Sequence, residues 1–317
     1  MVGYILRRLL LALPVLAGIS LLSFSLVRLV PGDTVTAMLG MNYTEEQAAT
    51  LRRELGLDRS LAVQYGRWAA RAIRGDLGAS HFTGLPVTGA ILERLPVTLQ
   101  LAGGAVLLAL LIALPLGVAG AARRGGAVDA AASGVGILGL SVPNFWLGTL
   151  LILFFSMTLG WLPSGGFVPF GIDPVENLRS MILPTCALAA AVCAVLVRMI
   201  RSSVIEVLDQ DYILMAEAKG CSPARVVWRH ALRNAMIPVI TVLGIQVGYL
   251  LGGSVVIEAV FSLPGIGQLA LQAISNRDYV LLQGVILFVG SAFLAINLVV
   301  DVLYAALNPA IRVGGPS

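Results

Sequence analysis

Six long apolar stretches constrain the fold of this chain more than any other feature of its sequence. A bilayer core about 30 Å thick requires about 20 consecutive apolar residues for a helix to cross it. Stretches of about this length lie at residues 9–30, 97–122, 130–159, 181–197, 237–257 and 280–300. Only 12% of the residues are charged, against about 25% in an ordinary soluble domain. We therefore predict an all-α, polytopic membrane protein with six transmembrane helices.

The basic residues predict the orientation of these spans. Six spans place both termini on one side of the membrane, and the short loops on the other side carry only Arg179 and Arg277. The ends and short loops on the terminal side carry Arg7, Arg8, Arg123, Arg124, Arg198, Arg201, Lys219, Arg225, Arg229, Arg233 and Arg312. Because short cytoplasmic loops are enriched in Lys and Arg, we expect both termini and the polar segment 198–236 to be cytoplasmic. The formal net charge of +4 reflects this topology, and we do not expect nucleic acid as a partner.

The spans divide the chain into three regions. Residues 1–30 form the N-terminus and the first span, which is too long, and too lacking in a small-residue cleavage site, for a cleaved signal peptide. Residues 31–96 form an extracytoplasmic cap, and residues 97–317 form a core of five spans. In the cap, Thr44 and Gln47 make a capping box for a helix from residue 45 to about 55, which Gly56 stops. A second amphipathic helix is indicated by the apolar positions Leu61, Tyr65, Trp68 and Ala72. The cap has either a structural role or contact with a partner protein.

The polar segment 198–236 reads as a docking element. Residues 212–219 are mostly good helix formers, and Gly220 tolerates the left-handed conformation that closes a helix. Ser222 offers a capping hydroxyl and Pro223 suits the first helical position. We expect a second helix from here to about Asn234, so that the segment is helix, glycine corner, helix.

Several absences argue against an enzyme. The only lysine is Lys219, and Ala218 precedes it, so the chain has no G-x-x-x-x-G-K-[ST] phosphate loop. It also has no H-E-x-x-H motif. We expect no catalytic residues and no bound cofactor. We also expect no metal site, because His81 and His230 are predicted on opposite sides of the membrane and the three cysteines cannot complete a ligand set with them.

The spans contain few polar groups. Glu258 and Asp301 lie at predicted span ends, where a carboxylate either reaches the membrane interface or has a structural role, and we expect neither to be a proton relay. A repeat of Gly244, Gly248 and Gly252 on one helix face favours close helix packing over pore lining.

The third stretch, residues 130–159, is long enough to require tilt or a break at Pro143. Ser141 and Asn144 flank this break, and Gln246 and Tyr249 lie in the fifth span. We name these four residues as a possible translocation pathway, because they offer neutral hydrogen-bonding groups.

A turn and a short helix follow the fifth span. Pro264 and Gly265 suit the centre of a type II turn. One face of the helix is then formed by Ile266, Leu269, Ala270, Ala273 and Ile274. We expect this element on the outer surface, as either a gate or a brace.

Motifs throughout the chain resemble the dipeptide/oligopeptide/nickel family of bacterial ABC importer permeases. The resemblance rests on R-M-I-R-S-S-V-I-E-V-L-D-Q-D-Y from Arg198, A-K-G from Ala218, H-A-L-R-N-A from His230, I-P-V-I-T from Ile237 and E-A-V-F-S-L-P-G-I-G from Glu258. It extends to P-G-D at Pro31, L-G-L-D-R-S-L-A-V-Q-Y at Leu55, G-D-L-G-A-S at Gly75, S-V-P-N-F-W at Ser141 and N-R-D-Y at Asn276. The long outer segment after the first span resembles the B-type member of the paired permeases.

The resemblance implies a type I ABC importer permease fold in a prokaryotic inner membrane, surrounded by lipid. It implies a sister permease, two cytoplasmic ATPase subunits that bind ATP and Mg, and an extracytoplasmic substrate-binding protein. In that family the polar segment is the coupling loop, which assigns ATPase contact to Tyr212, Leu214, Met215, Ala216, Glu217, Ala218, Lys219 and Gly220. The chain departs from the family at Asn308-Pro309-Ala310, where many members carry an arginine, and Arg312 is the candidate substitute.

The resemblance leaves the cargo open between short peptides and nickel or a nickel chelate. A path for bare metal ions would be expected to offer His, Cys or acidic ligands within the spans. The neutral groups of the four pathway candidates favour peptides or similar small polar solutes. A stand-alone secondary transporter is the alternative from another class, and the lack of buried ionisable groups in the spans and the size of the docking segment count against it.

Overall fold

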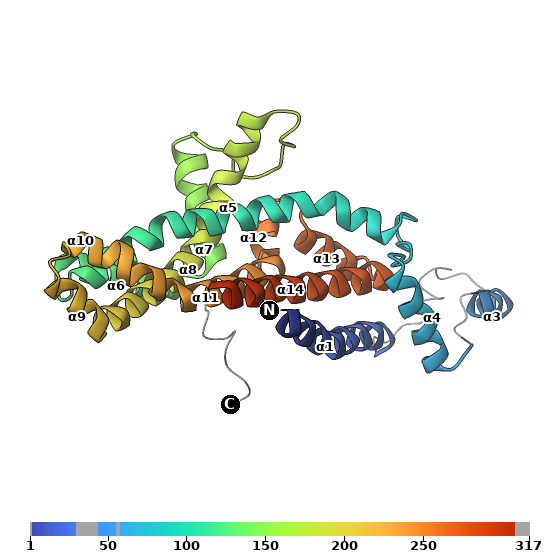
Figure 1. Cartoon of the computed structure of the whole chain (residues 1–317). Coiled ribbons are helices and arrows are strands. Elements are labelled where there is room, and N and C mark those ends of the chain that lie inside the picture. Colours follow the sequence, from blue (N-terminus) through green and yellow to red (C-terminus); the bar gives the residue numbers. More distant parts are fainter. Residues whose placement is uncertain (1, 30–43, 55–57, 308–317) are drawn as a thin grey trace.

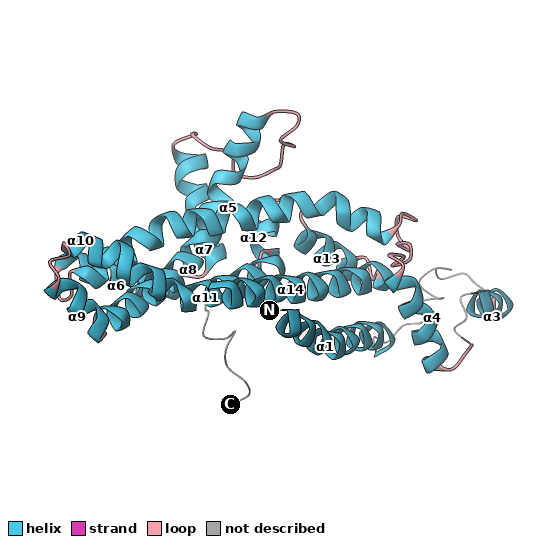
Figure 2. Ribbon diagram, in the orientation of Figure 1, coloured by secondary structure: helices cyan, strands magenta, loops and turns pink. Residues whose placement is uncertain are grey.

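The computed structural model describes residues 2–29, 44–54 and 58–307, and these residues fold into helices joined by turns and short loops. Figures 1 and 2 show long helices running side by side, with α9 and α10 at one end and α3 and α4 at the other. We call these the α9 end and the cap end. The helices are α1 (Val2–Leu29), α3 (Glu45–Glu54), α4 (Leu61–Ile73), α5 (Val87–Ala122), α6 (Ala127–Ser141), α7 (Asn144–Leu151), α8 (Pro174–Leu208), α9 (Asp211–Ala218), α10 (Pro223–Arg225), α11 (Leu232–Gly253), α12 (Val255–Val260), α13 (Ile266–Ser275) and α14 (Tyr279–Leu307), with the π-helices η1 (Ile152–Thr158) and η2 (Val226–Ala231).

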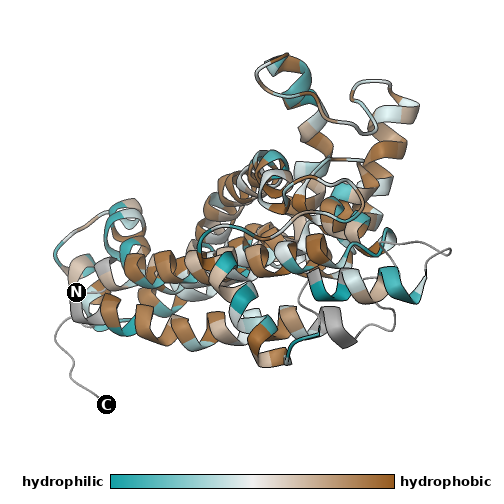
Figure 3. Cartoon of the chain, turned by 90° about the vertical axis from the view of Figure 1, so that its right-hand side faces the viewer, coloured by the Kyte–Doolittle hydropathy of each residue, from teal (hydrophilic) through white to brown (hydrophobic). Residues whose placement is uncertain are grey.

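The predicted spans are confirmed as helices long and apolar enough to cross a membrane. Five such helices are present in the described residues, and a bent pair gives a sixth if it is counted as one span. Hydrophobic residues predominate along the long helices (Figure 3). Some helices are longer than the apolar runs that predicted them. Helix α5 begins at Val87 and has 36 residues, about 54 Å at 1.5 Å per residue. It therefore projects beyond a hydrocarbon core about 30 Å thick.

The second helix of the polar segment does not end near Asn234 as predicted. Helices α10, η2 and α11 run without interruption from Pro223 to Gly253. The sequence between Pro223 and Pro238 contains no glycine or proline that would stop a helix. Pro238 itself lies inside α11, as membrane helices allow when neighbouring groups satisfy the freed carbonyl. The polar segment also begins inside a helix, since α8 continues past Arg198 to Leu208.

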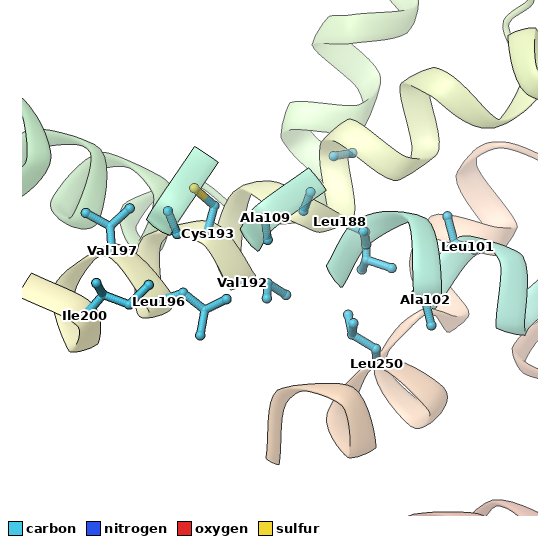
Figure 4. Close-up of a cluster of buried hydrophobic side chains, with 14 of the residues drawn as sticks. Leu101, Ala102, Ala109, Leu188, Val192, Cys193, Leu196, Val197, Ile200 and Leu250 are labelled. Carbon is cyan, nitrogen blue, oxygen red and sulfur yellow. The ribbon is translucent and has the colours of Figure 1, made fainter. Parts of the chain in front are cut away.

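The core forms where α8 packs against α5. Buried residues of α8, including Leu188, Val192 and Leu196, lie in one apolar cluster with residues of α5 (Figure 4). On α5 the facing positions are mostly small, with Ala105 and Ala109 both fully buried. Small side chains let two helix backbones approach closely, which is how membrane helices gain packing energy when lipid is as apolar as their side chains.

Of the two alternatives for residues 130–159, tilt or a break at Pro143, the structure shows the break. Helices α6 and α7 meet at an angle of 98° across Val142 and Pro143. Proline lacks the N–H that would continue the helix, and it disfavours helical geometry in the residue before it. The segment after the bend, α7 with η1, projects from the body of the molecule beside the first part of α8 (Figure 1).

The cap packs on the end of α1. Tyr65 of α4 hydrogen-bonds to Ser20 at 2.8 Å, and the ring of Phe24 lies 5.4 Å from Tyr65 and 5.9 Å from Trp68. The predicted capping box is present, because Thr44 N donates to Gln47 Oε1 at 3.0 Å and Gln47 N donates to Thr44 Oγ1 at 3.3 Å. Gly56 and Leu55 lie outside the described residues, so the predicted stop of α3 stays a prediction.

The cap also contacts the start of α14. Ser80 Oγ donates to buried Asp278, and His81 N donates to the same carboxylate at 3.4 Å. Burial lowers the pKa of the His81 imidazole, and the negative charge of Asp278 opposes this shift. The imidazole is therefore largely neutral at pH 7.

The turn after the fifth span differs from the prediction. A type II turn requires a positive φ at its third residue, but Gly265 has a φ of −96° and ψ of −177°. The left-handed residue is Ser262 instead, with a φ of 52°. Glycine is required at 265 for space, since a Cβ there would overlap the carboxyl group of Glu258.

The glycine repeat of α11 packs against α14, as predicted. A Cβ added to Gly244 would lie 2.9 Å from Val300 Cβ, and one added to Gly248 would lie 2.6 Å from Phe293 Cδ2. A Cβ at Gly252 would be in ordinary contact, 3.8 Å from Val289. The first two glycines therefore set the separation of α11 and α14.

We predict that Gly244→Ala destabilises the protein and that Gly252→Ala, the matched control, does not. Overpacking of this kind costs about 1–3 kcal/mol. The measurement is the thermal unfolding of the detergent-solubilised complex that contains each variant. Equal unfolding temperatures for Gly244→Ala and the wild type would show that α11 and α14 are not held together at this face.

Candidate functional site

The helix predicted at residues 212–219 is present as α9, and a glycine closes it. Gly220 has a φ of +79°. Its N–H donates to Glu217 O at 2.8 Å, and Cys221 N donates to Ala216 O at 3.2 Å. These two bonds make a Schellman motif, which satisfies carbonyls that the helix end would leave unpaired. Ser222 and Pro223 then begin α10 as predicted, although the Ser222 side chain makes no capping hydrogen bond.

One side of α9 is anchored to the following helix. Ile213 is buried and clusters with Val226 and Ala231 of η2. Asn234 Nδ2 donates to the Tyr212 hydroxyl at 2.8 Å. Residues on both sides of the glycine corner thus hold α9 in a fixed position against η2 and the start of α11.

The other side of α9 is open. The side chains of Leu214 and Met215 are 60% and 59% exposed, and Trp228 of η2 is 54% exposed. Glu217, Ala218, Lys219 and Gly220 are also exposed, whereas Ala216 is half-buried. The α9 end therefore presents large apolar side chains within a polar setting, a pattern typical of a protein contact surface.

Two ion pairs that the sequence did not predict hold the end of α8, which leads into α9, against α6 and the loop before it. Arg201 on α8 forms a bidentate pair with Asp129 of α6, with Nη2 at 2.9 Å from Oδ2. Arg124 Nη2 lies 3.1 Å from Asp209 Oδ2 and donates to Ile205 O at 2.9 Å. The arginines were visible in the sequence only as topology signals. No local pattern indicated acidic partners more than 70 residues away.

The four pathway candidates lie in two places. Ser141 ends α6, where its hydroxyl donates to Ile137 O at 2.9 Å, and Asn144 begins α7 after the bend. Gln246 and Tyr249 lie one turn apart on α11, where Gln246 is half-buried and Tyr249 is 65% exposed. The two pairs lie on separate helices, and their role in a pathway stays a prediction.

The expectation that the spans lack buried ionisable groups is wrong at Glu258. The side chain of Glu258 is fully buried and accepts hydrogen bonds from three residues, so it has the structural role of the two alternatives. The sequence could not show that partners from distant helices surround it. Asp301 pairs with Arg8 of α1 at 3.0 Å. This pair places the start of α1 beside the last part of α14.

A search of the described residues finds no group of three or more His, Cys, Asp or Glu side chains that could hold a metal ion. Within the same residues the three cysteines are unpaired, at positions 186, 193 and 221. The motif Asn308-Pro309-Ala310 and Arg312 lie outside the part of the chain that the structure describes.

Comparison with solved structures supports this fold. The chain is similar to a subunit of the MetNI methionine ABC transporter in an inward-facing conformation, with a TM-score of 0.57 and 19% sequence identity. The similar region covers 69% of this chain and 96% of that one. At this identity the likeness concerns the fold, which is that of a type I ABC importer permease.

Comparison of the sequence identifies relatives along nearly the whole chain. It is 44% identical over 312 residues to the "Putative peptide transport system permease protein" of Brucella abortus (strain 2308), covering 98% of this chain and 99% of that protein. It is 42% identical over 312 residues to the glutathione transport system permease protein GsiC of Salmonella paratyphi A, with the same coverage.

Two family profiles together match most of the sequence. The profile for the N-terminal membrane component of binding-protein-dependent transport systems matches residues 1–102. The profile for the inner membrane component of these systems matches residues 105–313. The chain belongs to the binding-protein-dependent transport system inner membrane component family, as a permease subunit of an ABC importer.

Proposed function

We propose that this permease imports short peptides or similar small polar solutes, which an extracytoplasmic binding protein delivers, and that two partner ATPases drive alternating access. The observation that supports coupling between the ATPases and this permease is the anchored helix α9 with its exposed apolar side chains. The relatives named above serve peptide and glutathione transport systems, and glutathione is itself a short peptide. The cargo proposal rests on these names and on the neutral pathway candidates.

The exposed face of α9 fits a groove on a cytoplasmic ATPase. Leu214 and Met215 project from a short helix whose opposite side is fixed by Ile213 and by the Tyr212–Asn234 hydrogen bond. A pre-ordered helix loses little conformational entropy when it docks. Burial of its apolar side chains would drive association, at about 25 cal/mol per Å² of apolar surface.

Movement of α9 would be transmitted to the membrane spans through the adjacent helices α8 and α6. The pairs Arg201–Asp129 and Arg124–Asp209 connect the last turns of α8 to α6 and to the loop before it. A push on α9 would therefore shift α6 and α8 together. In this scheme ATP and Mg bind only to the partner ATPases, because this chain contains no phosphate loop.

A second, similar permease would complete the pathway. The projecting segment after the bend exposes large apolar side chains, among them Phe154 (54%), Met157 (73%) and Trp161 (61%). Lipid can cover part of this surface. The family resemblance favours a sister permease for the rest, with the whole complex in the inner membrane and both termini cytoplasmic.

We predict that Gly220→Val weakens coupling and that Gly220→Asn largely preserves it. Nothing lies within 4 Å of a Cβ at this position, so the effect comes from backbone strain alone. A left-handed conformation costs an ordinary L-residue roughly 1–2 kcal/mol, and asparagine tolerates it better than a β-branched residue. The measurements are membrane abundance and transport-linked ATP hydrolysis of the whole complex. Normal coupling in Gly220→Val at normal abundance would remove the role assigned to this corner.

We predict that cysteines introduced at Ser60 and Ser222 in a background without the natural cysteines label from opposite sides of the membrane. Both serines are exposed, and the distribution of arginines places Ser60 outside. The measurement is labelling of intact cells by a membrane-impermeant maleimide, before and after permeabilisation. Labelling of both positions in intact cells would overturn the proposed orientation.

We predict that cells without this gene lose uptake of di- or oligopeptides and keep nickel accumulation. The measurement is uptake of labelled peptides and of nickel in deletion and complemented strains. Loss of nickel accumulation with intact peptide uptake would instead favour the nickel or nickel-chelate importer. Uptake by the purified chain alone in proteoliposomes, driven by an ion gradient, would revive the secondary transporter.

A further inference from the structure

The carboxylate of Glu258 joins helices α12, α5 and α13. Its Oε1 accepts hydrogen bonds from Thr98 Oγ1 of α5 and from Ser254 Oγ, each at 2.9 Å. Its Oε2 accepts from Gln268 N, in the first turn of α13, at 2.9 Å. The side chain of Glu258 is fully buried, as are those of Thr98 and Ser254.

This carboxylate takes the place of an N-cap for α13. The N-cap residue of α13 is Gly265, which has no side chain to accept from the first N–H groups of the helix. Glu258 accepts from Gln268 N instead, and Thr98 Oγ1 accepts from Ile266 N at 2.9 Å. The carboxyl group thus lies at the N-terminal end of α13, where the helix leaves N–H groups without internal partners. The start of α13 is therefore satisfied by side chains from α12 and α5, not by its own sequence.

Two glycines make room for this arrangement. A Cβ at Gly265 would overlap the Glu258 carboxyl group, and one at Gly267 would lie 2.6 Å from Val255 Cα and 3.0 Å from Glu258 Oε2. The close approach of α12 and α13 thus depends on both glycines. Within the motif E-A-V-F-S-L-P-G-I-G, the glutamate and the two glycines form one packing unit.

Buried residues extend this unit to its neighbours. Phe261 is fully buried, its carbonyl accepts from Gly166 N at 2.9 Å, and a Cβ on Gly148 of α7 would meet its ring at 3.0 Å. On the other side of the turn, α13 packs against α5 and α14 through an apolar cluster. The buried members of this cluster are Val87, Ile91, Ile266, Leu269, Ala273, Leu281 and Val285.

The buried carboxyl group of Glu258 makes separation of these helices costly. No ion pair among the described residues includes Glu258, so the helix end and the two hydroxyls are its partners. Removing α13 would leave this buried group without its backbone donor, and a buried polar group without its partner is destabilising. Any motion that keeps α5, α12 and α13 together avoids this cost.

We propose that Glu258 is a positioning residue of the transport cycle. It locks α12, α13 and the part of α5 around Thr98 into one rigid block, which moves as a unit between the two access states. This inference rests on the proposed alternating-access function. It assigns α13 the role of a brace that never separates from α5.

The experiment follows the burial of one position on α13 through the cycle. Ala273 is 1% exposed and lies in the cluster that α13 shares with α5, whereas Ile274 beside it is 56% exposed. Ala273→Cys and Ile274→Cys are placed separately in a complex without other cysteines. Each is treated with a membrane-impermeant maleimide, at rest and after trapping with ATP and vanadate.

The expected result is that Cys at 274 labels in both states and Cys at 273 labels in neither. In a Glu258→Ala background, labelling at 273 should rise roughly tenfold or more, since local opening then costs less. Glu258→Gln should give an intermediate rise, because its amide oxygen can still accept from Gln268 N. Glu176→Ala, which removes a half-buried carboxylate paired with Arg179, should leave the labelling unchanged.

Labelling of Cys at 273 in the trapped wild-type complex would overturn the proposal, because the block would then open during the cycle. Unchanged protection in Glu258→Ala would overturn it as well. If Glu258→Ala does not accumulate in the membrane, Thr98→Val decides the same question, with increased labelling expected and unchanged protection contradicting the proposal.

A second readout separates positioning from simple folding support. Glu258→Ala complexes at normal abundance should keep ATP hydrolysis and lose uptake, and Glu258→Gln should recover part of the uptake. The labelling result does not depend on the cargo. A wrong cargo assignment would change the uptake assays and leave the protection of position 273 as it is.

Discussion

Hydrocarbon offers no partner to an unpaired peptide group, and the rest of this structure depends on that constraint. The turn after α12 interrupts the helices in the apolar core, and substitute partners accompany it. Leu263 N donates to Glu258 O at 2.8 Å and Gly166 N donates to Phe261 O at 2.9 Å. This irregular segment therefore closes its own backbone hydrogen bonds.

The features that the sequence predicted are those with local signals. Apolar length predicted the spans, Thr44 and Gln47 predicted a capping box, and Gly220 predicted a helix end in the left-handed conformation. Each of these depends on residues within a few positions of one another. Pro143 likewise acts on its immediate neighbours, so the bend was predictable even though its angle was not.

The features that the sequence did not predict depend on residues that meet only after folding. Thr98 and Glu258 are 160 positions apart, and Asp129 and Arg201 are 72 apart. A glutamate near the end of an apolar run has the same local pattern whether it reaches lipid headgroups or caps a distant helix. Similarly, Pro264-Gly265 is typical of a type II turn, and only the position of the Glu258 carboxylate shows that glycine is needed there for space.

The continuous helix formed by α10, η2 and α11 has a mechanical consequence. It begins immediately after the corner at Gly220 and ends at Ser254, whose hydroxyl binds Glu258. Its 31 residues measure about 46 Å, so a tilt of about 10° at one end would displace the other by about 8 Å. In the proposed coupling this single helix would act as a lever arm, because its length would convert a small rotation at the α9 end into a displacement larger than the diameter of a water molecule at its other end.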